Sequence, residues 1–266
     1  MKIRGLLLDV EGVLVGDKRY GAVDTAVDFI RQVRAAKCPF RLISNNTTDD
    51  RSTIIAKLKY AGFDFTLDEL HTCTSAAVKA LRALKAGRCL VLGNVALRRI
   101  FLDAGFAVVD DRDVDAVVVG LDTDLTYQRL QLACEAILRH RAAFLALHHN
   151  RLYGDTTGRP APSVGALSAA IEYATQTEPV VIGKPSPAYF QQALDDLGVP
   201  ETDVLVVSDD PLSDLAGAKR LGMRAAFVLS GKYSDPAVLA SITANEKPDL
   251  IADRIGDLLA SGDVVL

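Results

Sequence analysis

Short apolar runs of strand length alternate along the chain with segments of helical period. Such alternation is typical of βαβ units that build a mostly parallel sheet. The pattern therefore predicts an α/β fold with a Rossmann-like core. The four predicted strand and helix pairs are 5–10 with 24–36, 40–43 with 49–61, 180–182 with 187–197, and 204–207 with 211–221.

Start and stop signals frame the two later helices. Ser186 stands before Pro187, where it can cap the helix, and Gly198 follows the last helical residue. Gly222 follows the next helix in the same way. Serine before and glycine after a helix are favoured at these positions, so both helices should have well-defined ends.

A long segment between the second and third pairs carries strands and helices of its own. Its strand-like runs are 89–92, 106–109, 116–120 and 144–147. We interpret 77–179 as an inserted α/β domain, with 1–76 and 180–266 forming the core. The longest irregular segment is predicted at 148–163.

Polar side chains follow every predicted strand of the core. In open α/β sheets ligands bind beyond the carboxyl ends of the strands, so these side chains should meet in one site. They are Asp9 and Glu11 after the first run, Ser44 and Asn45 after the second, Lys184 after the third, and Asp209 and Asp210 after the fourth, with Asp214 one turn later.

This set of groups matches the needs of phosphoryl transfer. The reaction uses an oxygen nucleophile, a divalent metal held by hard oxygen ligands, and fixed cations and donors around the phosphate. Asp9 can attack, Asp9 and Asp209 can hold magnesium, and Lys184 with Ser44 can grip the phosphate.

Four motifs resemble those of the haloacid dehalogenase (HAD) superfamily of phosphatases. They are L-L-D-V-E-G-V-L, I-S-N-N-T, V-I-G-K-P-S-P and V-V-S-D-D-P-L-S-D. The insertion between the second and third motifs resembles a C2-type cap, including the run G-L-D-T-D-L-T-Y. The most similar branch is the one that contains phospholysine phosphohistidine inorganic pyrophosphate phosphatase.

The resemblance implies a role for each motif residue. It implies that Asp9 is the nucleophile and a Mg²⁺ ligand, with Asp209 and the backbone carbonyl at Glu11 as further metal ligands. Phosphate contacts are implied for Ser44, Asn45 and Lys184, the last of which also steadies the nucleophile. Asp210 and Asp214 would support these groups from close by. A small phosphorylated substrate and a cap-mediated homodimer are also implied.

Two positions depart from the usual motifs. Glu11 stands where most of these phosphatases have the aspartate that protonates the leaving oxygen, and Ser208 replaces a glycine. Residues two apart on an extended segment share a side, so Glu11 should face the site with Asp9. A misplaced general acid would slow the reaction by about 10² to 10⁴. A catalytically impaired protein that binds a phosphate ligand is therefore the alternative to an enzyme.

Each of these residues also has a purely structural interpretation. Asp9, Asp210 and Asp214 could serve helix N-termini, Ser44 and Asn45 could be turn residues, and Lys184 could be solvated. Agreement among four strand ends favours the catalytic interpretation. His148 and His149 lie side by side, but with only His140 nearby we predict no metal site there.

The composition and charge of the chain bear on its binding partners and on the class of protein. The formal net charge is −4 with mixed signs along the chain, so we expect no nucleic-acid or membrane partner. The four cysteines are far apart, which predicts buried free thiols. We find no signal peptide, membrane span or G-x-G-x-x-G motif, and therefore expect a soluble, cytoplasmic protein and no dinucleotide-dependent dehydrogenase.

Overall fold

The computed structural model describes residues 1–16, 20–154 and 157–266, and the chain separates into two compact units. The first comprises Met1–Ser44, Arg51–His71 and Lys184–Leu266, and the second Asn45–Asp50 and Thr72–Gly183. The predicted assignment of 1–76 with 180–266 as catalytic core and 77–179 as cap stays a prediction, because compactness alone assigns neither role.

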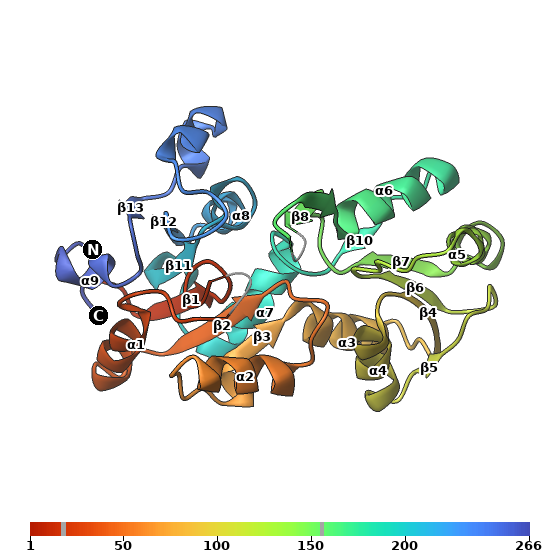
Figure 1. Cartoon of the computed structure of the whole chain (residues 1–266), viewed down its shortest axis with the longest axis horizontal. Helices are drawn as coiled ribbons and strands as arrows, with labels where there is room; N and C mark the ends of the chain where they lie inside the picture. Colours follow the sequence, from red (N-terminus) through yellow and green to blue (C-terminus); the bar gives the residue numbers. More distant parts are fainter. Residues whose placement is uncertain (17–19, 155–156) are drawn as a thin grey trace. The chain divides into compact units, whose positions relative to one another are not determined.

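The first unit is built on a six-stranded sheet in the order β13-β12-β11-β1-β2-β3 (Figure 1). Parallel pairing joins β1 to both β11 and β2, with Leu7 opposite Val206 on one side and Arg41 on the other. This register brings the carboxyl ends of the three central strands to one edge. The strands are β1 (Gly5–Asp9), β2 (Phe40–Ser44), β3 (Leu70–Thr72), β11 (Val204–Ser208), β12 (Arg224–Val228) and β13 (Leu250–Ala252).

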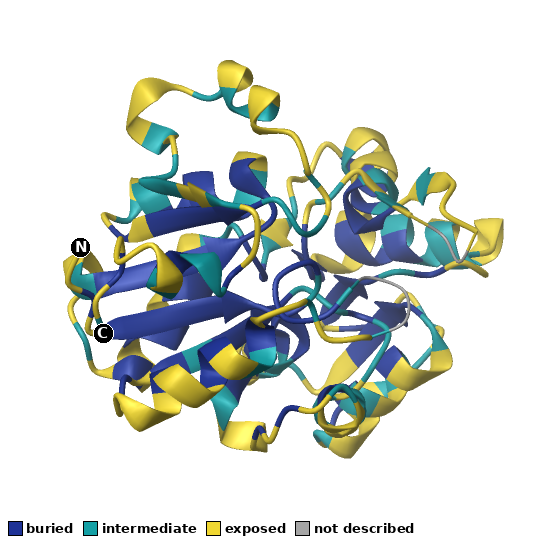
Figure 2. Cartoon of the chain, turned by 60° about the vertical axis from the view of Figure 1, so that its left-hand side comes forward, coloured by how far each residue is buried: buried dark blue, intermediate teal, exposed yellow. Residues whose placement is uncertain are grey.

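The central strands are apolar on both faces because helices cover both faces. Leu6 and Leu8 pack with Phe29 of α1 (Ala26–Ala35) and Leu58 of α2 (Arg51–Tyr60). The helices α7 (Pro187–Leu197) and α8 (Ala216–Arg220) contact β2 and β12, and their buried residues lie outside that cluster. Figure 2 shows these strands as buried, while the outward sides of the helices are exposed.

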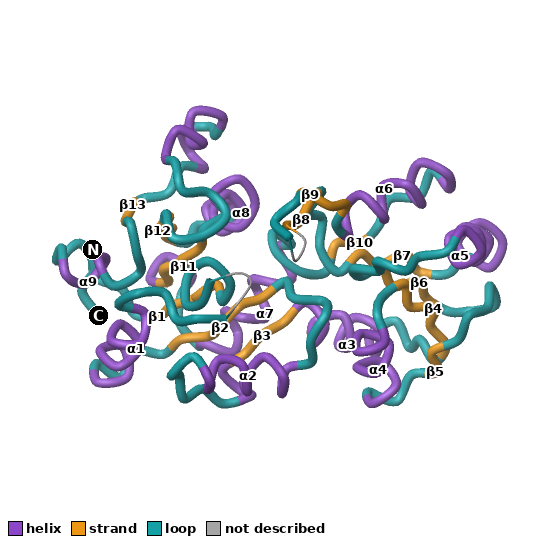
Figure 3. The backbone as a smooth tube through the Cα atoms, viewed as in Figure 1, coloured by secondary structure: helices purple, strands orange, loops and turns teal. Residues whose placement is uncertain are grey.

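The second unit holds a five-stranded sheet in the order β10-β7-β6-β4-β5 (Figure 3). Its strands are β4 (Arg88–Leu92), β5 (Ala107–Val108), β6 (Ala116–Val119), β7 (Ala143–Ala146) and β10 (Val180–Val181). One apolar cluster joins this sheet to buried residues of α5 and α6. The helices are α3 (Cys73–Ala83), α4 (Val95–Asp103), α5 (Tyr127–His140) and α6 (Val164–Thr175).

The predicted strand over 180–182 belongs to the second sheet, so its prediction as a core strand was wrong. Val180 of β10 lies opposite Leu145 of β7 in a parallel pair. The apolar pattern of so short a run gives its extended conformation but not its partner. Lys184 is the third residue after the end of β10 and begins the next part of the first unit.

The predicted helix ends are confirmed at α7 with one difference. The helix begins at Pro187 and ends before Gly198, whose φ of 65° lies in the left-handed region. Among the described residues, the Ser186 side chain makes no capping hydrogen bond, so its predicted cap was wrong. Pro187 at the first helical position supplies a fixed φ instead.

Two further segments differ from the expected pattern. The helix predicted over 211–221 is a π-helical turn, η3 (Pro211–Leu215), followed by α8. The segment predicted as irregular contains an antiparallel pair, β8 (Leu152–Gly154) and β9 (Pro160–Pro162), and its residues 155–156 lie outside the described residues. The remaining short helices are α9 (Asp257–Ala260), η1 (Leu67–Glu69), η2 (Glu201–Asp203), η4 (Pro236–Ser241) and η5 (Ala244–Glu246).

The helices were compared with the length and apolar character of a membrane span. In the part of the chain that the structure describes, none combines the length and the apolar character that crossing a bilayer requires.

All four cysteines are free thiols, and they differ in exposure. Cys38, Cys73 and Cys89 are buried, whereas Cys134 is partly exposed. Burial raises the pKa of the Cys89 thiol to about 11, and nearby Asp115 adds to the rise. A thiol that stays protonated and covered is a poor nucleophile.

We therefore expect one thiol of the native protein to react with a disulfide reagent well before the other three. Cys134→Ser should remove this fast phase, and unfolding should release the rest. The measurement is the time course of thiol titration with and without denaturant. Rapid reaction of two or more thiols in the native protein would contradict the burial described.

Candidate active site

Three polar residues end the three central strands of the first unit. Asp9 is the last residue of β1, Ser44 of β2 and Ser208 of β11, and each is at most 6% exposed. Because the strands are parallel neighbours, the three side chains emerge at the same edge of the sheet. The predicted convergence of strand ends is therefore seen in the structure for these residues.

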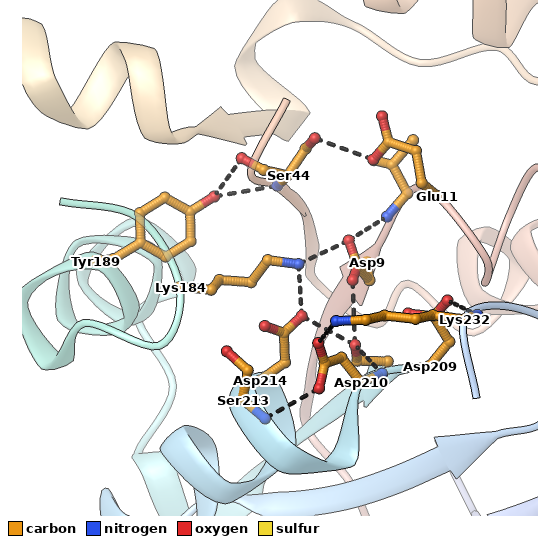
Figure 4. A network of polar contacts seen from close by, with 12 residues as sticks. Asp9, Glu11, Ser44, Lys184, Tyr189, Asp209, Asp210, Ser213, Asp214 and Lys232 are labelled. Carbon is orange, nitrogen blue, oxygen red and sulfur yellow. Dashed lines mark hydrogen bonds and ion pairs between the residues drawn. The ribbon is translucent and has the colours of Figure 1, made fainter. Parts of the chain in front are cut away.

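Lys184 ties two carboxylates together at this edge. Its Nζ lies 2.7 Å from Asp9 Oδ1 and 2.7 Å from Asp214 Oδ2 (Figure 4). Burial lowers the pKa of Lys184, but Asp214 and Asp9 outweigh it and hold that pKa well above its usual value. The ammonium is thus a fixed positive charge beside Asp9.

The Asp9 carboxyl lies in a strongly negative setting. Burial raises its pKa, Lys184 opposes that rise, and Asp214, Asp209 and Glu11 add to it, so that the result lies well above the usual value. Asp214 is also buried, but Lys184 holds its pKa below the usual value. An ionised Asp9 therefore needs positive charge close by.

Ser208 links the groups around Asp9 through its hydroxyl. Its Oγ lies 3.1 Å from Asp9 Oδ2 and 2.9 Å from Asp214 Oδ2, and with one proton it donates to one of them at a time. The same oxygen accepts the Asp210 N–H at 3.1 Å. The residue that replaces the usual glycine is thus part of the polar network.

Asp210 and Lys232 form a second ion pair next to the first. Asp210 Oδ2 lies 2.7 Å from Lys232 Nζ, and its Oδ1 accepts the backbone N–H groups of Leu212 and Ser213 at the start of η3. The predicted structural role of Asp210 at a helix start is thereby observed. Burial lowers the pKa of Lys232, but Asp210 outweighs it and raises that pKa above its usual value.

Asp209 is enclosed by backbone on two sides. A Cβ placed on either Gly12 or Gly231 would come within 1.9 Å of Asp209 Oδ2. That oxygen also accepts the Lys232 backbone N–H at 2.6 Å. Side chains are thus excluded at both glycines, which leaves room for the carboxylate to lie against the backbone after β1.

These groups fit a hard divalent cation. Four carboxylates, Asp9, Asp209, Asp210 and Asp214, are buried here. Among the described residues, the ion pairs of Asp9, Asp210 and Asp214 involve two ammonium groups, Lys184 and Lys232. Carboxylate and carbonyl oxygens suit Mg²⁺. Within residues 1–16, 20–154 and 157–266, no three or more His, Cys, Asp or Glu side chains group as metal ligands. The metal ligands expected from the sequence are not a group of three side chains. They are the Asp9 and Asp209 side chains together with the backbone carbonyl at Glu11.

Glu11 faces Ser44 across the end of the sheet. Ser44 Oγ donates to Glu11 Oε2 at 3.1 Å, and Tyr20 Oη donates to Glu11 Oε1 at 2.8 Å. The Ser44 N–H donates to Tyr189 Oη at 3.1 Å, which fixes the backbone at the end of β2. Figure 4 shows Glu11 and Ser44 on one side of Asp9, and the carboxylates of Asp209, Asp210 and Asp214 on the other.

Asn45 and the histidines considered from the sequence belong to the second unit. Asn45 directly follows Ser44, and its Oδ1 lies 2.3 Å from where a Cβ on Gly183 would stand. His148 is buried, and its Nδ1 accepts the Asn150 N–H at 3.3 Å. The phosphate contact of Asn45 stays a prediction.

Sequence reasoning missed three residues of this network: Tyr20, Tyr189 and Lys232. Lys232 follows the end of β12, so extending the strand-end rule to that strand would have found it. Tyr189 lies on the inner face of α7, where a tyrosine hydroxyl needs a partner. Tyr20 lies in a loop that gives no such signal.

The comparisons with known proteins agree with this geometry. A family profile described as haloacid dehalogenase-like hydrolase matches residues 6–107, and a second, HAD-hydrolase-like profile matches residues 181–258. These two ranges contain Asp9 and Ser44 on one side and Lys184 and Asp209 on the other.

Relatives match over nearly the whole chain. A phospholysine phosphohistidine inorganic pyrophosphate phosphatase from Xenopus laevis is 31% identical over 98% of this chain and 96% of its own length. The structure of a p-nitrophenyl phosphatase from Archaeoglobus fulgidus matches with a TM-score of 0.89 and 26% identity, covering 98% of this chain and 100% of that one. NagD from E. coli K-12 matches with a TM-score of 0.84 and 25% identity, over 97% and 98%. The chain therefore belongs to the haloacid dehalogenase-like hydrolases, among the phosphatases of that family.

Removing the Lys184 ammonium should destabilise the fold. Lys184→Ala leaves Asp9 and Asp214 buried without their shared cation, and breaking a buried ion pair in this way costs about 3–5 kcal/mol. Arg31→Ala is the control, because its pair with Asp28 has side chains 74% and 69% exposed and exposed pairs contribute under about 1 kcal/mol. Urea unfolding of both variants in chelator measures the difference, and equal free energies of unfolding would contradict it.

Proposed function

We propose that the protein hydrolyses a small phosphate ester or phosphoanhydride with Mg²⁺, through an aspartyl-phosphate on Asp9. The position of Asp9 carries this proposal. Its Oδ1 lies 2.7 Å from Lys184 Nζ at the carboxyl edge of the sheet, and Asp209 is close enough to raise its pKa. A carboxylate in such a place can attack phosphorus while a cation beside it balances charge.

The reaction has two displacements. In the first, a carboxylate oxygen of Asp9 forms a bond to phosphorus, and the bond from phosphorus to the leaving oxygen breaks. Glu11 gives its proton to that leaving oxygen. In the second, Glu11 takes a proton from water, the water oxygen bonds to phosphorus, and the Asp9 carboxylate departs, which restores both side chains.

The other predicted residues hold the reacting groups. Lys184, Ser44 and Asn45 would bind the phosphate oxygens, and Asp210 and Asp214 would support the site through Lys232 and Lys184. Asp9, Asp209 and the backbone carbonyl at Glu11 would hold Mg²⁺. When bound, Mg²⁺ supplies positive charge that stabilises the transferring phosphoryl group.

The names of the relatives support turnover. The relative from Xenopus laevis is named for phosphorylated amino acids and inorganic pyrophosphate, and the neighbour from Archaeoglobus fulgidus for p-nitrophenyl phosphate. Because these relatives are named as phosphatases, they disfavour the alternative of an impaired binding protein.

The test is phosphate release from a panel of small phosphomonoesters and pyrophosphate, with Mg²⁺ and with chelator. Wild type should release phosphate with Mg²⁺ alone. Asp9→Asn should lower the rate by about 10³-fold or more, because it removes the nucleophile.

Asp68→Asn is the matched control, since Asp68 lies on the exposed short helix η1 and should leave the rate unchanged. An inactive wild type together with an active Glu11→Asp would overturn the proposal, since it would show that the natural glutamate disables turnover.

A further inference from the structure

Backbone pairing joins residues 14–16, which follow β1, to residues 21–23, which follow Tyr20. Gly16 N donates to Gly21 O at 2.9 Å, and Val23 N donates to Leu14 O at 2.9 Å. Val15 and Ala22 also pair in the antiparallel sense. These bonds fix the backbone that directly follows Tyr20.

Each oxygen of the Glu11 carboxylate has its own hydroxyl donor. Tyr20 Oη donates to Oε1 at 2.8 Å, and Ser44 Oγ donates to Oε2 at 3.1 Å. Two donors on different oxygens, one from the loop and one from the end of β2, fix both the direction of the carboxylate and its rotation. One donor alone would leave the rotation free.

The backbone at Tyr20 gives a second, independent observation. Its φ is 49°, in the left-handed region that glycine and asparagine enter more easily than tyrosine. The Tyr20 ring also has the Lys57 ammonium 4.9 Å from its centroid. A tyrosine stands here although glycine would enter this backbone conformation more easily, and its ring and hydroxyl both make contacts.

Glutamate needs such fixing more than aspartate does. Its side chain has one more rotatable bond, so its carboxylate reaches more positions relative to Asp9. Proton transfer requires the acid within hydrogen-bond reach of the leaving oxygen. We propose that Tyr20 is a positioning residue that holds the Glu11 carboxylate for proton transfer, an inference that rests on the proposed function of the site.

The leaving group distinguishes this role from a general effect on folding. An alkyl leaving group departs as a strongly basic oxygen and depends on protonation, whereas p-nitrophenolate departs without it. The kcat/KM value reports the first displacement, in which Glu11 gives its proton. Loss of positioning should therefore lower kcat/KM for an alkyl phosphate much more than for p-nitrophenyl phosphate.

The experiment compares wild type with Tyr20→Phe on glycerol phosphate and p-nitrophenyl phosphate. We expect kcat/KM to fall about tenfold or more on glycerol phosphate and less than about threefold on p-nitrophenyl phosphate. Tyr60→Phe removes the same hydroxyl from a residue that is 92% exposed and should change neither value. Melting temperatures show whether each variant is folded.

A double-mutant cycle supplies the second measurement. Glu11→Gln should show the same selective loss on glycerol phosphate, and adding Tyr20→Phe to it should lower kcat/KM little further. Equal falls on both substrates in Tyr20→Phe, or independent losses in the double variant, would overturn the role of Tyr20 while leaving the phosphatase proposal intact. Absence of phosphate release from wild type would instead overturn the proposed function and this inference with it.

Discussion

The ion pairs of Lys184 with Asp9 and Asp214 are the interaction on which this site depends. Lys184 is 2% exposed, and its Nζ lies 2.7 Å from an oxygen of each carboxylate. Burying an unpaired charge costs several kcal/mol, so the two carboxylates and the ammonium stabilise one another only as a set. Lys184 opposes the rise in the pKa of Asp9 that burial and the neighbouring carboxylates cause.

Backbone N–H groups and loop residues stabilise the other carboxylates of the site. The N–H groups at the start of η3 bind Asp210, and the Lys232 backbone N–H binds Asp209. Gly12 and Gly231 allow Asp209 to lie against the main chain. These features fit a site that gathers more negative charge than its lysines offset, which is the setting that a divalent cation stabilises.

The sequence predicted the fold class and the strand ends because both follow from local periodicity. Asp9 and Ser44 could be placed together by a single rule about parallel sheets. The same rule was applied to Lys184, although the strand before it belongs to the other sheet. The sheet to which 180–182 belongs could not be predicted, because a short apolar run carries no information about its partner strand. Tyr20 could not be found either, because its approach to Glu11 depends on backbone pairing next to it that the apolar pattern does not indicate. Asn45 was grouped with Ser44 by adjacency, yet the boundary between the two units falls between them.

The proposed reaction requires the Asp9 carboxylate to become covalently phosphorylated during turnover. The most direct measurement is to quench the enzyme during reaction with a phosphorylated substrate, reduce any acyl phosphate with borohydride, and locate the altered residue by peptide mass spectrometry. Asp9 should be reduced to homoserine in the substrate-treated sample and stay unaltered in a sample without substrate. Reduction at another carboxylate, or turnover that leaves every carboxylate unaltered, would contradict it.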